Sequence, residues 1–234
     1  MSVLREKYSS KYRLEDNDLI IFDMDGLLLD TERISVNALI KACKEFGYTL
    51  DRNLAIQRIG TSRKAKDDFY LKYMGSNFPK EEVNKLKDKY FIETIYERNT
   101  ILKDGVMEIL DYLDYLGLKK AVATSTFKNR ATKLLKLMNI YSRFDLVLCG
   151  DEVVGYKPDP EIYKRVCNNL CVRKEKAIVL EDSDIGALAA YNAGIRYILI
   201  PDLKPPTKES LKNAYGVVNS LENLIADEYI KKIR

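Results

Sequence analysis

Short apolar runs alternate with longer amphipathic stretches along most of the chain. Each run has four to six residues and is rich in aliphatic side chains, which is typical of strands covered by helices on both faces. Alternating strands and helices predict an α/β fold with a Rossmann-like parallel sheet. The runs occupy residues 19–22, 120–124, 144–149, 177–181 and 197–200, with 216–219 as a sixth candidate.

Three of the amphipathic stretches carry clear helix-end signals. Residues 104–117 show one apolar stripe and end on Gly117, and residues 182–194 end on Gly194, as helices often do. Residues 158–170 begin with prolines and acidic residues, which is a common helix start. These patterns predict helices between the strands.

Residues 32–99 break the alternation, because they show helical patterns and no convincing strand. Three helices are predicted there, at 33–47, 62–75 and 79–98. The insertion begins beside the end of the first strand, and ligands of parallel sheets bind beyond such strand ends. We therefore expect an all-helical cap domain over that edge. The predicted division is a leader at 1–18, a core at 19–31 and 100–234, and the cap at 32–99.

Composition narrows the class of protein. The chain is 46% apolar with a net charge of +4, which fits a globular protein and gives no sign of nucleic-acid binding. No segment resembles a signal peptide or a membrane span. The four cysteines show no CxxC spacing, so we expect free thiols in a reducing compartment such as the cytoplasm; they are Cys43, Cys149, Cys167 and Cys171. We also expect the protein to be a monomer. Because histidine is absent, acid–base chemistry must use other side chains, and metals that prefer oxygen ligands are favoured.

The stretch "IIFDMDGLLLDTE" places Asp23 and Asp25 directly after the first strand. Two carboxylates this close are costly unless a positive charge lies with them. Mg²⁺ fits, since it prefers hard oxygen ligands and often uses one or two carboxylates. One carboxylate could then attack phosphorus while the other exchanges a proton. An ordinary turn held by Asx hydrogen bonds would explain the same residues without a metal.

The other strand ends add complementary groups. Residues 124–126 offer hydroxyls for phosphate oxygens, Lys157 follows the third strand, and Glu181 and Asp182 end the fourth. Each feature alone has a structural explanation as a cap, a surface lysine or a helix entry. Together they place acid, hydroxyl, cation and acid at one sheet edge, which indicates a phosphoryl-transfer site.

These motifs resemble those of the haloacid dehalogenase-like hydrolase superfamily, in its β-phosphoglucomutase-like branch with a helical cap. The matching segments are "FDMDGLLLDTE", "VATST", "GYKPDPEIY" and "LEDSDIGALAAYNAG". The resemblance implies that Asp23 is the nucleophile that forms an aspartyl-phosphate. It also implies that Asp25 is the general acid and base, with its backbone carbonyl on Mg²⁺.

The resemblance implies roles for the remaining residues as well. The segment "IGTSR" resembles a cap loop whose arginine, here Arg63, reaches the substrate; a surface arginine is the alternative. The implied phosphate ligands are Thr124, Ser125 and Lys157, and the implied metal ligands are Asp23, Asp25, Glu181 and Asp182.

The expected function is that of a Mg²⁺-dependent phosphatase acting on a small phosphorylated metabolite, such as a sugar phosphate. Dehalogenases of the superfamily lack the second aspartate, so phosphoryl transfer is favoured. The β-phosphoglucomutase pattern has a histidine where this chain has Ser35, which favours hydrolysis over a hexose-phosphate mutase. A non-catalytic phosphate-binding module is the third possibility, but it would need no nucleophile paired with an acid.

Overall fold

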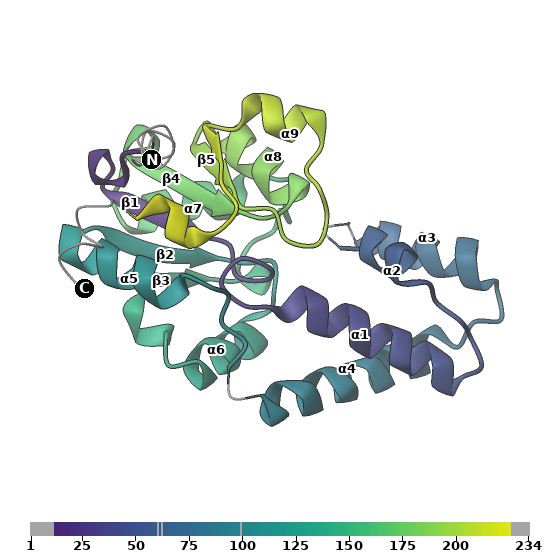
Figure 1. The fold of residues 1–234 in the computed structure, drawn as a ribbon. Coiled ribbons are helices and arrows are strands. Elements are labelled where there is room, and N and C mark those ends of the chain that lie inside the picture. The colour runs from purple at the N-terminus through teal and green to yellow at the C-terminus, as the bar shows by residue number, and fades with distance from the viewer. Residues whose placement is uncertain (1–11, 60, 62, 99, 226–234) are drawn as a thin grey trace, which may run out of the picture.

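The computed structural model describes residues 12–59, 61, 63–98 and 100–225. Its core is a parallel sheet built from β1 (Leu19–Phe22), β2 (Lys119–Ala123), β3 (Leu146–Leu148), β4 (Ala177–Glu181), β5 (Arg196–Leu199) and β6 (Gly216–Val217). The strand order is β3-β2-β1-β4-β5-β6, so β1 lies between β2 and β4 (Figure 1). The predicted Rossmann-like α/β fold is confirmed.

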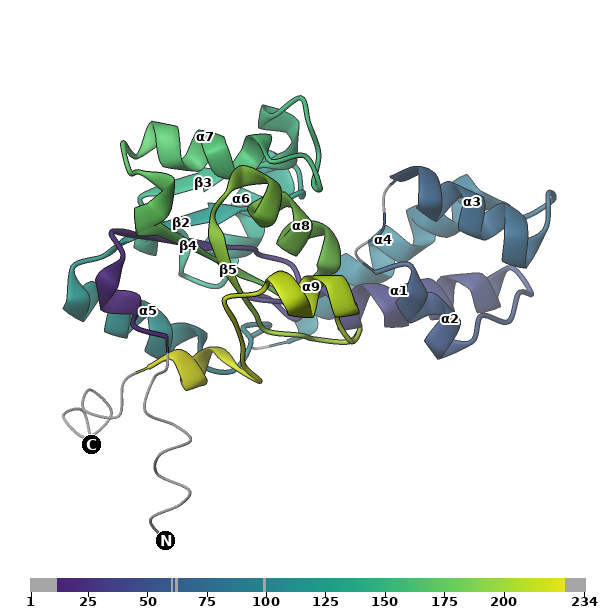
Figure 2. The same cartoon turned by 90° about the horizontal axis from the view of Figure 1, so that it is seen from above.

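Helices cover both faces of the sheet. They are α5 (Val106–Leu116), α6 (Lys128–Leu137), α7 (Glu161–Asn169), α8 (Asp184–Ala193) and the short α9 (Lys208–Asn213). Alternate strand residues point to opposite faces. Ile20 and Phe22 share an apolar cluster with α5 and α6, whereas Leu19 and Ile21 share another with α7 and α8. Figure 2 shows α5 and α7 on opposite sides of the sheet. Burial on both faces explains the apolar runs.

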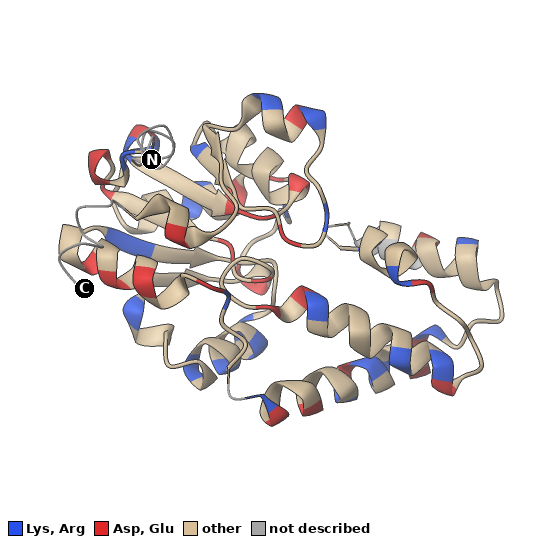
Figure 3. Ribbon diagram, viewed as in Figure 1, with Lys and Arg blue, Asp and Glu red and all other residues tan. Residues whose placement is uncertain are grey.

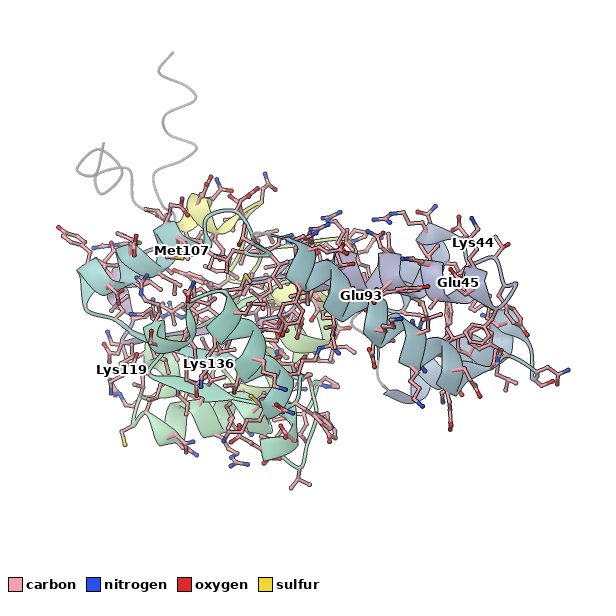
Figure 4. The ribbon with its side chains drawn as sticks, turned by 90° about the horizontal axis from the view of Figure 1, so that it is seen from below. Lys44, Glu45, Glu93, Met107, Lys119 and Lys136 are labelled. Carbon is pink, nitrogen blue, oxygen red and sulfur yellow. The ribbon has the colours of Figure 1, made fainter. Side chains whose placement is uncertain are left out.

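Four of the described helices lie between β1 and α5 in the chain: α1 (Thr31–Glu45), α2 (Arg52–Gln57), α3 (Arg63–Met74) and α4 (Lys80–Glu97). We call them the helical layer. They pack around an apolar cluster of their own, which includes Leu39, Phe69 and Val83. The layer extends away from one end of the sheet (Figure 1), and Lys44 and Glu45 lie at its far end (Figure 4). The short helix α2 had not been predicted.

Two linkers join the helical layer to the sheet, and they lie side by side. Leu29 of the outgoing linker forms a bridge with Leu102 of the returning one. The N–H of Asp30 donates to the carbonyl of Ile101 at 2.8 Å. The insertion therefore leaves and re-enters the core at one place, which supports a division of the chain there.

Part of the predicted leader packs on the sheet. Leu14 is buried in the same cluster as Ile20, and the N–H of Asp18 donates to the carbonyl of Lys176 at 2.8 Å. These contacts tie residues 12–18 to the core. Among the described helices, none has an apolar stretch of the length that a bilayer requires.

Candidate active site

The candidate site lies where β1 and its neighbours end. Phe22 of β1 pairs with Val122 of β2 and with Leu180 of β4, so the residues that follow all three strands meet at one edge. Acidic residues gather on the loops at this edge, facing the helical layer (Figure 3). The sequence prediction that these strand ends converge is therefore supported by the register of the sheet.

Gly26 shapes the turn that presents the two aspartates. Its φ is +88°, a left-handed conformation that a side chain disfavours. Its N–H donates to the carbonyl of Leu29 at 2.8 Å and closes the turn. A Cβ at this position would lie 2.2 Å from Oδ2 of Asp182. The backbone therefore needs glycine here both for its conformation and for the approach of a site carboxylate.

Lys157 lies at the centre of the cluster and is almost fully buried. Its Nζ donates to Oδ1 of Asp23 at 2.6 Å, to Oε1 of Glu181 at 2.7 Å and to the carbonyl of Ala123 at 3.0 Å. All three hydrogens of an ammonium group are thereby used. The lysine thus ties together residues from β2, β4 and the loop after β1.

Glu181 is fully buried, and both of its oxygens are engaged. Oε1 accepts from Lys157 and, at 2.8 Å, from the hydroxyl of Tyr163 on α7. Oε2 accepts from the N–H of Asp182 and from the N–H and hydroxyl of Ser183, at 2.9 to 3.1 Å. Glu181 therefore anchors the lysine and shapes the loop that carries Asp182. Tyr163 ends the matching segment "GYKPDPEIY", but sequence analysis assigned it no role.

The cluster holds more negative than positive charge. Oxygens of Asp23, Glu181 and Asp182 lie within 4.8 Å of one another, with the ammonium of Lys157 as their close cation. Burial raises the pKa of Asp23 to about 8, against the opposing effect of Lys157. Burial, with Glu181 and Asp23 adding, raises the pKa of Asp182 well above its usual range. A divalent cation would relieve this repulsion, and the all-oxygen donor set suits Mg²⁺.

Lys157 and Glu181, unlike Asp23 and Asp182, have pKa values shifted in the direction that favours their charged forms. Burial opposes the charge on Lys157, but Asp23 and Glu181 outweigh it and hold the pKa of the ammonium well above its usual value. Burial also opposes the charge on Glu181, yet Lys157 and the surrounding hydrogen bonds lower its pKa. Lys157 and Glu181 thus form a charged pair, and the remaining repulsion falls on Asp23 and Asp182.

Asp25 faces hydroxyl groups instead of the lysine. Its Oδ1 accepts from Thr31 at 2.7 Å. Its Oδ2 accepts from Thr126 at 2.7 Å and from Thr124 at 3.2 Å. A carboxylate held in this way is fixed in orientation, as a group that transfers protons must be. The predicted phosphate ligand Thr124 is buried beside it, and its oxygen accepts from the N–H of Thr126 at 3.0 Å.

A cavity of about 290 Å³ opens onto these groups between the core and the helical layer. The predicted residues Asp23, Asp25, Ser125, Lys157 and Asp182 line it from the core. The helical layer contributes further lining. Thr126, which the sequence analysis had offered as a phosphate-binding hydroxyl, and Ser35, which stands where the mutase pattern has histidine, also line it. The lining residues to which sequence reasoning had given no role are Thr31, Glu32, Ile59, Thr61, Phe91, Arg130, Ser183 and Ile185.

Arg130 and Phe91 join the two parts of the molecule at the cavity wall. The guanidinium of Arg130 on α6 lies 4.1 Å from the centre of the Phe91 ring on α4. The predicted arginine, Arg63, begins α3, but its side chain lies outside the described part of the structure, as do Gly60 and Ser62 of the predicted loop. The predicted contact of Arg63 therefore stays a prediction.

Comparisons with known proteins agree with this picture. Residues 20–200 match the profile of the family described as "Haloacid dehalogenase-like hydrolase". A "Phosphorylated carbohydrates phosphatase" of Thermotoga maritima is 33% identical over 211 residues, which is 88% of this chain and 88% of that protein.

Solved structures are also similar over most of their length. CbbY from Rhodobacter sphaeroides, in complex with phosphate, has a TM-score of 0.72 and 27% identity, covering 88% of this chain and 95% of that one. A β-phosphoglucomutase from Clostridium difficile has a TM-score of 0.71 and 26% identity, covering 92% and 96%. The likeness therefore includes both the sheet and the helical layer.

Proposed function

Because the chain belongs to the haloacid dehalogenase-like hydrolases, we propose that it is a Mg²⁺-dependent phosphatase that hydrolyses a small phosphorylated carbohydrate through an aspartyl-phosphate. The relative from Thermotoga maritima supports both the reaction and the substrate class. One observation carries the proposal: three buried carboxylates lie within 4.8 Å of one another beside a polar cavity, and Lys157 pairs with two of them. The repulsion between these carboxylates would be relieved by a divalent cation, and the cavity beside them is where a phosphate ester would bind.

In the first step, a carboxylate oxygen of Asp23 forms a bond to phosphorus, and the bond from phosphorus to the ester oxygen breaks. The electron pair stays on the ester oxygen, which takes a proton from the carboxyl group of Asp25. An alcohol and an aspartyl-phosphate result. Asp25 is left as a carboxylate, ready to accept a proton from water in the second step, which releases inorganic phosphate and restores Asp23.

The surrounding residues bind the phosphate and balance its charge. Thr124 and Ser125 would donate to its oxygens. Lys157 would do so too by exchanging its bond to the carbonyl of Ala123 for one to the phosphate, while its bond to Asp23 favours the ionised form and orients it. Mg²⁺, held by Asp23, Asp182 and the main-chain carbonyl of Asp25 with Glu181 behind them, would supply Lewis-acid stabilisation of the transferring group. Both effects lower the repulsion between an anionic nucleophile and an anionic substrate.

The helical layer supplies the other wall of the cavity, and we propose that it serves as the cap predicted from the sequence. In this role it would exclude bulk water and select the alcohol part of the substrate, with Arg63 reaching toward it. We expect the enzyme to be cytoplasmic. We also expect it to act as a monomer, which size-exclusion chromatography would check.

A hexose-phosphate mutase is the second candidate, since a solved relative is a β-phosphoglucomutase. Ser35 lines the cavity at the position where the mutase pattern has histidine. A mutase must return its phosphoryl group to the sugar before water reaches it, and the loss of a histidine contact favours hydrolysis. A mutase would require a bisphosphate activator and release little phosphate.

The decisive experiment is a phosphate-release screen over sugar, polyol and nucleoside monophosphates, with and without Mg²⁺. We expect turnover of at least one carbohydrate phosphate that disappears with EDTA and in the Asp23→Asn variant. Binding of these compounds without turnover would favour the non-catalytic module. Undiminished activity of Asp23→Asn would refute the nucleophile assignment.

A further inference from the structure

The hydroxyl of Thr126 donates to Oδ2 of Asp25 at 2.7 Å, as close as the donation of Thr31 to Oδ1. We propose that Thr126 is a positioning residue: its hydroxyl orients the carboxyl group of Asp25 for proton transfer to the leaving oxygen. This inference rests on the proposed function, because it concerns the proton donor of that reaction. It assigns Thr126 to the acid and not to the phosphate.

Thr124 cannot keep this task during the reaction. A threonine hydroxyl has one hydrogen to donate. In the structure that hydrogen is directed to Oδ2 of Asp25, at 3.2 Å. If Thr124 binds a phosphate oxygen, which only accepts, it must withdraw its hydrogen from Asp25. Thr126 is then the hydroxyl that still holds Oδ2.

Thr31 and Thr126 contact Asp25 from different parts of the molecule. Thr31 is the first residue of α1 in the helical layer, whereas Thr126 follows β2 in the core. A shift of the layer would change the contact of Thr31 with Asp25 but not that of Thr126. The core hydroxyl is thus the one that can define the carboxyl plane throughout the reaction.

The backbone around Thr126 is held on both sides. Its N–H donates to the hydroxyl oxygen of Thr124 at 3.0 Å, and its carbonyl accepts from the N–H of Gly150 at 3.1 Å. Gly150 packs so closely that a Cβ there would lie 2.3 Å from the carbonyl oxygen of Ser125. A hydroxyl on so fixed a loop can hold its partner within the tolerance that catalysis requires.

Two phosphate esters whose leaving groups differ in basicity can distinguish a misoriented acid from general damage to the site. When phosphorus transfers to Asp23, the departing oxygen of phenyl phosphate is a strong base and needs the proton of Asp25. The departing oxygen of 4-nitrophenyl phosphate is a much weaker base and can leave without it. A misoriented acid should therefore slow the first ester and spare the second, while general damage to the site should slow both.

The experiment measures kcat/KM, which reports the first irreversible step, for both esters with Thr126→Val and Thr126→Ser. Valine keeps the shape and removes the hydroxyl. We expect Thr126→Val to lower kcat/KM for phenyl phosphate by about 10- to 100-fold, within the range of general acid catalysis, and for 4-nitrophenyl phosphate by less than about 3-fold. Thr126→Ser should restore the first value to within about 3-fold.

Two controls separate positioning from other roles. Inhibition by inorganic phosphate should be unchanged in Thr126→Val if the residue does not bind phosphate. Thr132→Val, on the neighbouring helix α6, should alter neither ester. Equal losses on both esters, weaker phosphate inhibition or failure of serine to rescue would each overturn the proposal. If the wild-type protein released phosphate from neither aryl ester and from no carbohydrate phosphate of the screen, the proposed function itself would fall.

Discussion

The core edge and the helical layer are organised by different forces. At the core edge, Asp23, Lys157 and Glu181 come from separate segments and are joined by short charged hydrogen bonds. In the helical layer, Phe69 and Tyr70 pack in an apolar cluster. The guanidinium of Arg58 lies 4.6 Å from the centre of the Tyr70 ring. The core edge is held by charged hydrogen bonds between groups that could take part in a reaction, and the helical layer is held by burial of apolar side chains.

This difference separates the two tasks of the protein. In the proposed mechanism, charge geometry at the core edge determines which bond is broken, so we expect changes there to alter turnover. Packing in the helical layer determines the shape of the cavity wall, and changes there should alter stability or recognition first. The linkers through Leu29 and Leu102 are where the two regions can influence each other.

The largest effect is expected from removing the central cation. Lys157→Met leaves Asp23 and Glu181 buried without their partner, so we expect turnover to fall by about 10³-fold and the free energy of unfolding by about 3–5 kcal/mol. Phosphate release and chemical denaturation would measure the two losses.

Lys120 offers a matched control for Lys157→Met. It is also buried, and its ammonium pairs with Asp114, away from the cavity lining. Lys120→Met should reduce stability while leaving turnover close to that of the wild type. Equal loss of turnover in both variants would contradict the special role of Lys157.

Truncating one apolar residue in each region tests whether the regions are separate. Leu180→Ala in β4 and Leu39→Ala in α1 each remove a fully buried side chain, which costs about 2–5 kcal/mol. We expect hydrogen exchange to speed up in the sheet for the first variant and within α1–α4 for the second. Faster exchange across both regions in the Leu39 variant would mean that they unfold as one unit.

The metal-free protein should become less stable as pH rises from about 5 to about 8. The pKa of Asp23 is raised from 3.8 to about 8, and that of Asp182 is raised too. Their stabilising contribution is therefore complete below the unfolded pKa and lost as pH rises through the folded one. Glu181, whose pKa is lowered from 4.5, acts oppositely, but only in more acidic solution.

Mg²⁺ should reverse this loss, because it replaces protons as the partner of the carboxylates. At 100 times its Kd the stabilisation is about 2.7 kcal/mol, and we expect the gain in Tm to grow between pH 5 and pH 8. Thermal scans with EDTA or Mg²⁺ measure it, with Asp182→Asn as the control that should lose most of the gain. A metal-free Tm that rises over this range would contradict the charge excess.

The smallest effect concerns the linkers. Oδ1 of Asp202 accepts from Lys103 on the returning linker at 2.5 Å and from Arg33 on α1 at 3.2 Å. Asp202→Asn removes both ion pairs, so we expect a loss of about 1 kcal/mol and faster hydrogen exchange at the linkers. Lys89→Ala on the exposed face of α4 is the neutral control. Unchanged linker exchange in the Asp202 variant would show that the ion pairs do not brace the junction.

Much of the fold follows from local pattern. The strands are short, apolar and buried on both faces, so the runs near Ile20, Val122 and Val179 predicted them within a residue or two. Gly117 ends α5 in a left-handed conformation, as its position after an apolar stripe indicated. Helix α6 was not predicted; its signal was the spacing of Ala131, Leu134 and Leu135, which are buried on one face.

The site was predictable where residues follow strands, either directly or, like Lys157, in the loop beyond. Asp23 and Asp182 occupy such positions, and the parallel register brings them together. Tyr163 and Arg130 lie on helices; Tyr163 ends the motif that carries Lys157, but no local pattern assigns either residue its contact. Their approach to Glu181 and Phe91 depends on how helices pack, which a single sequence does not encode locally.

The pairing of the two linkers has a practical consequence for engineering. The hydrogen bond from Asp30 to Ile101 holds the ends of the insertion together, but Ile34 and Phe91 within it also pack in the cluster of Ile20 and Phe22. We expect a segment from a related enzyme, grafted between these two positions as one cassette, to change the preferred alcohol if it keeps those two contacts. New specificities are therefore best sought by exchanging that cassette as one piece.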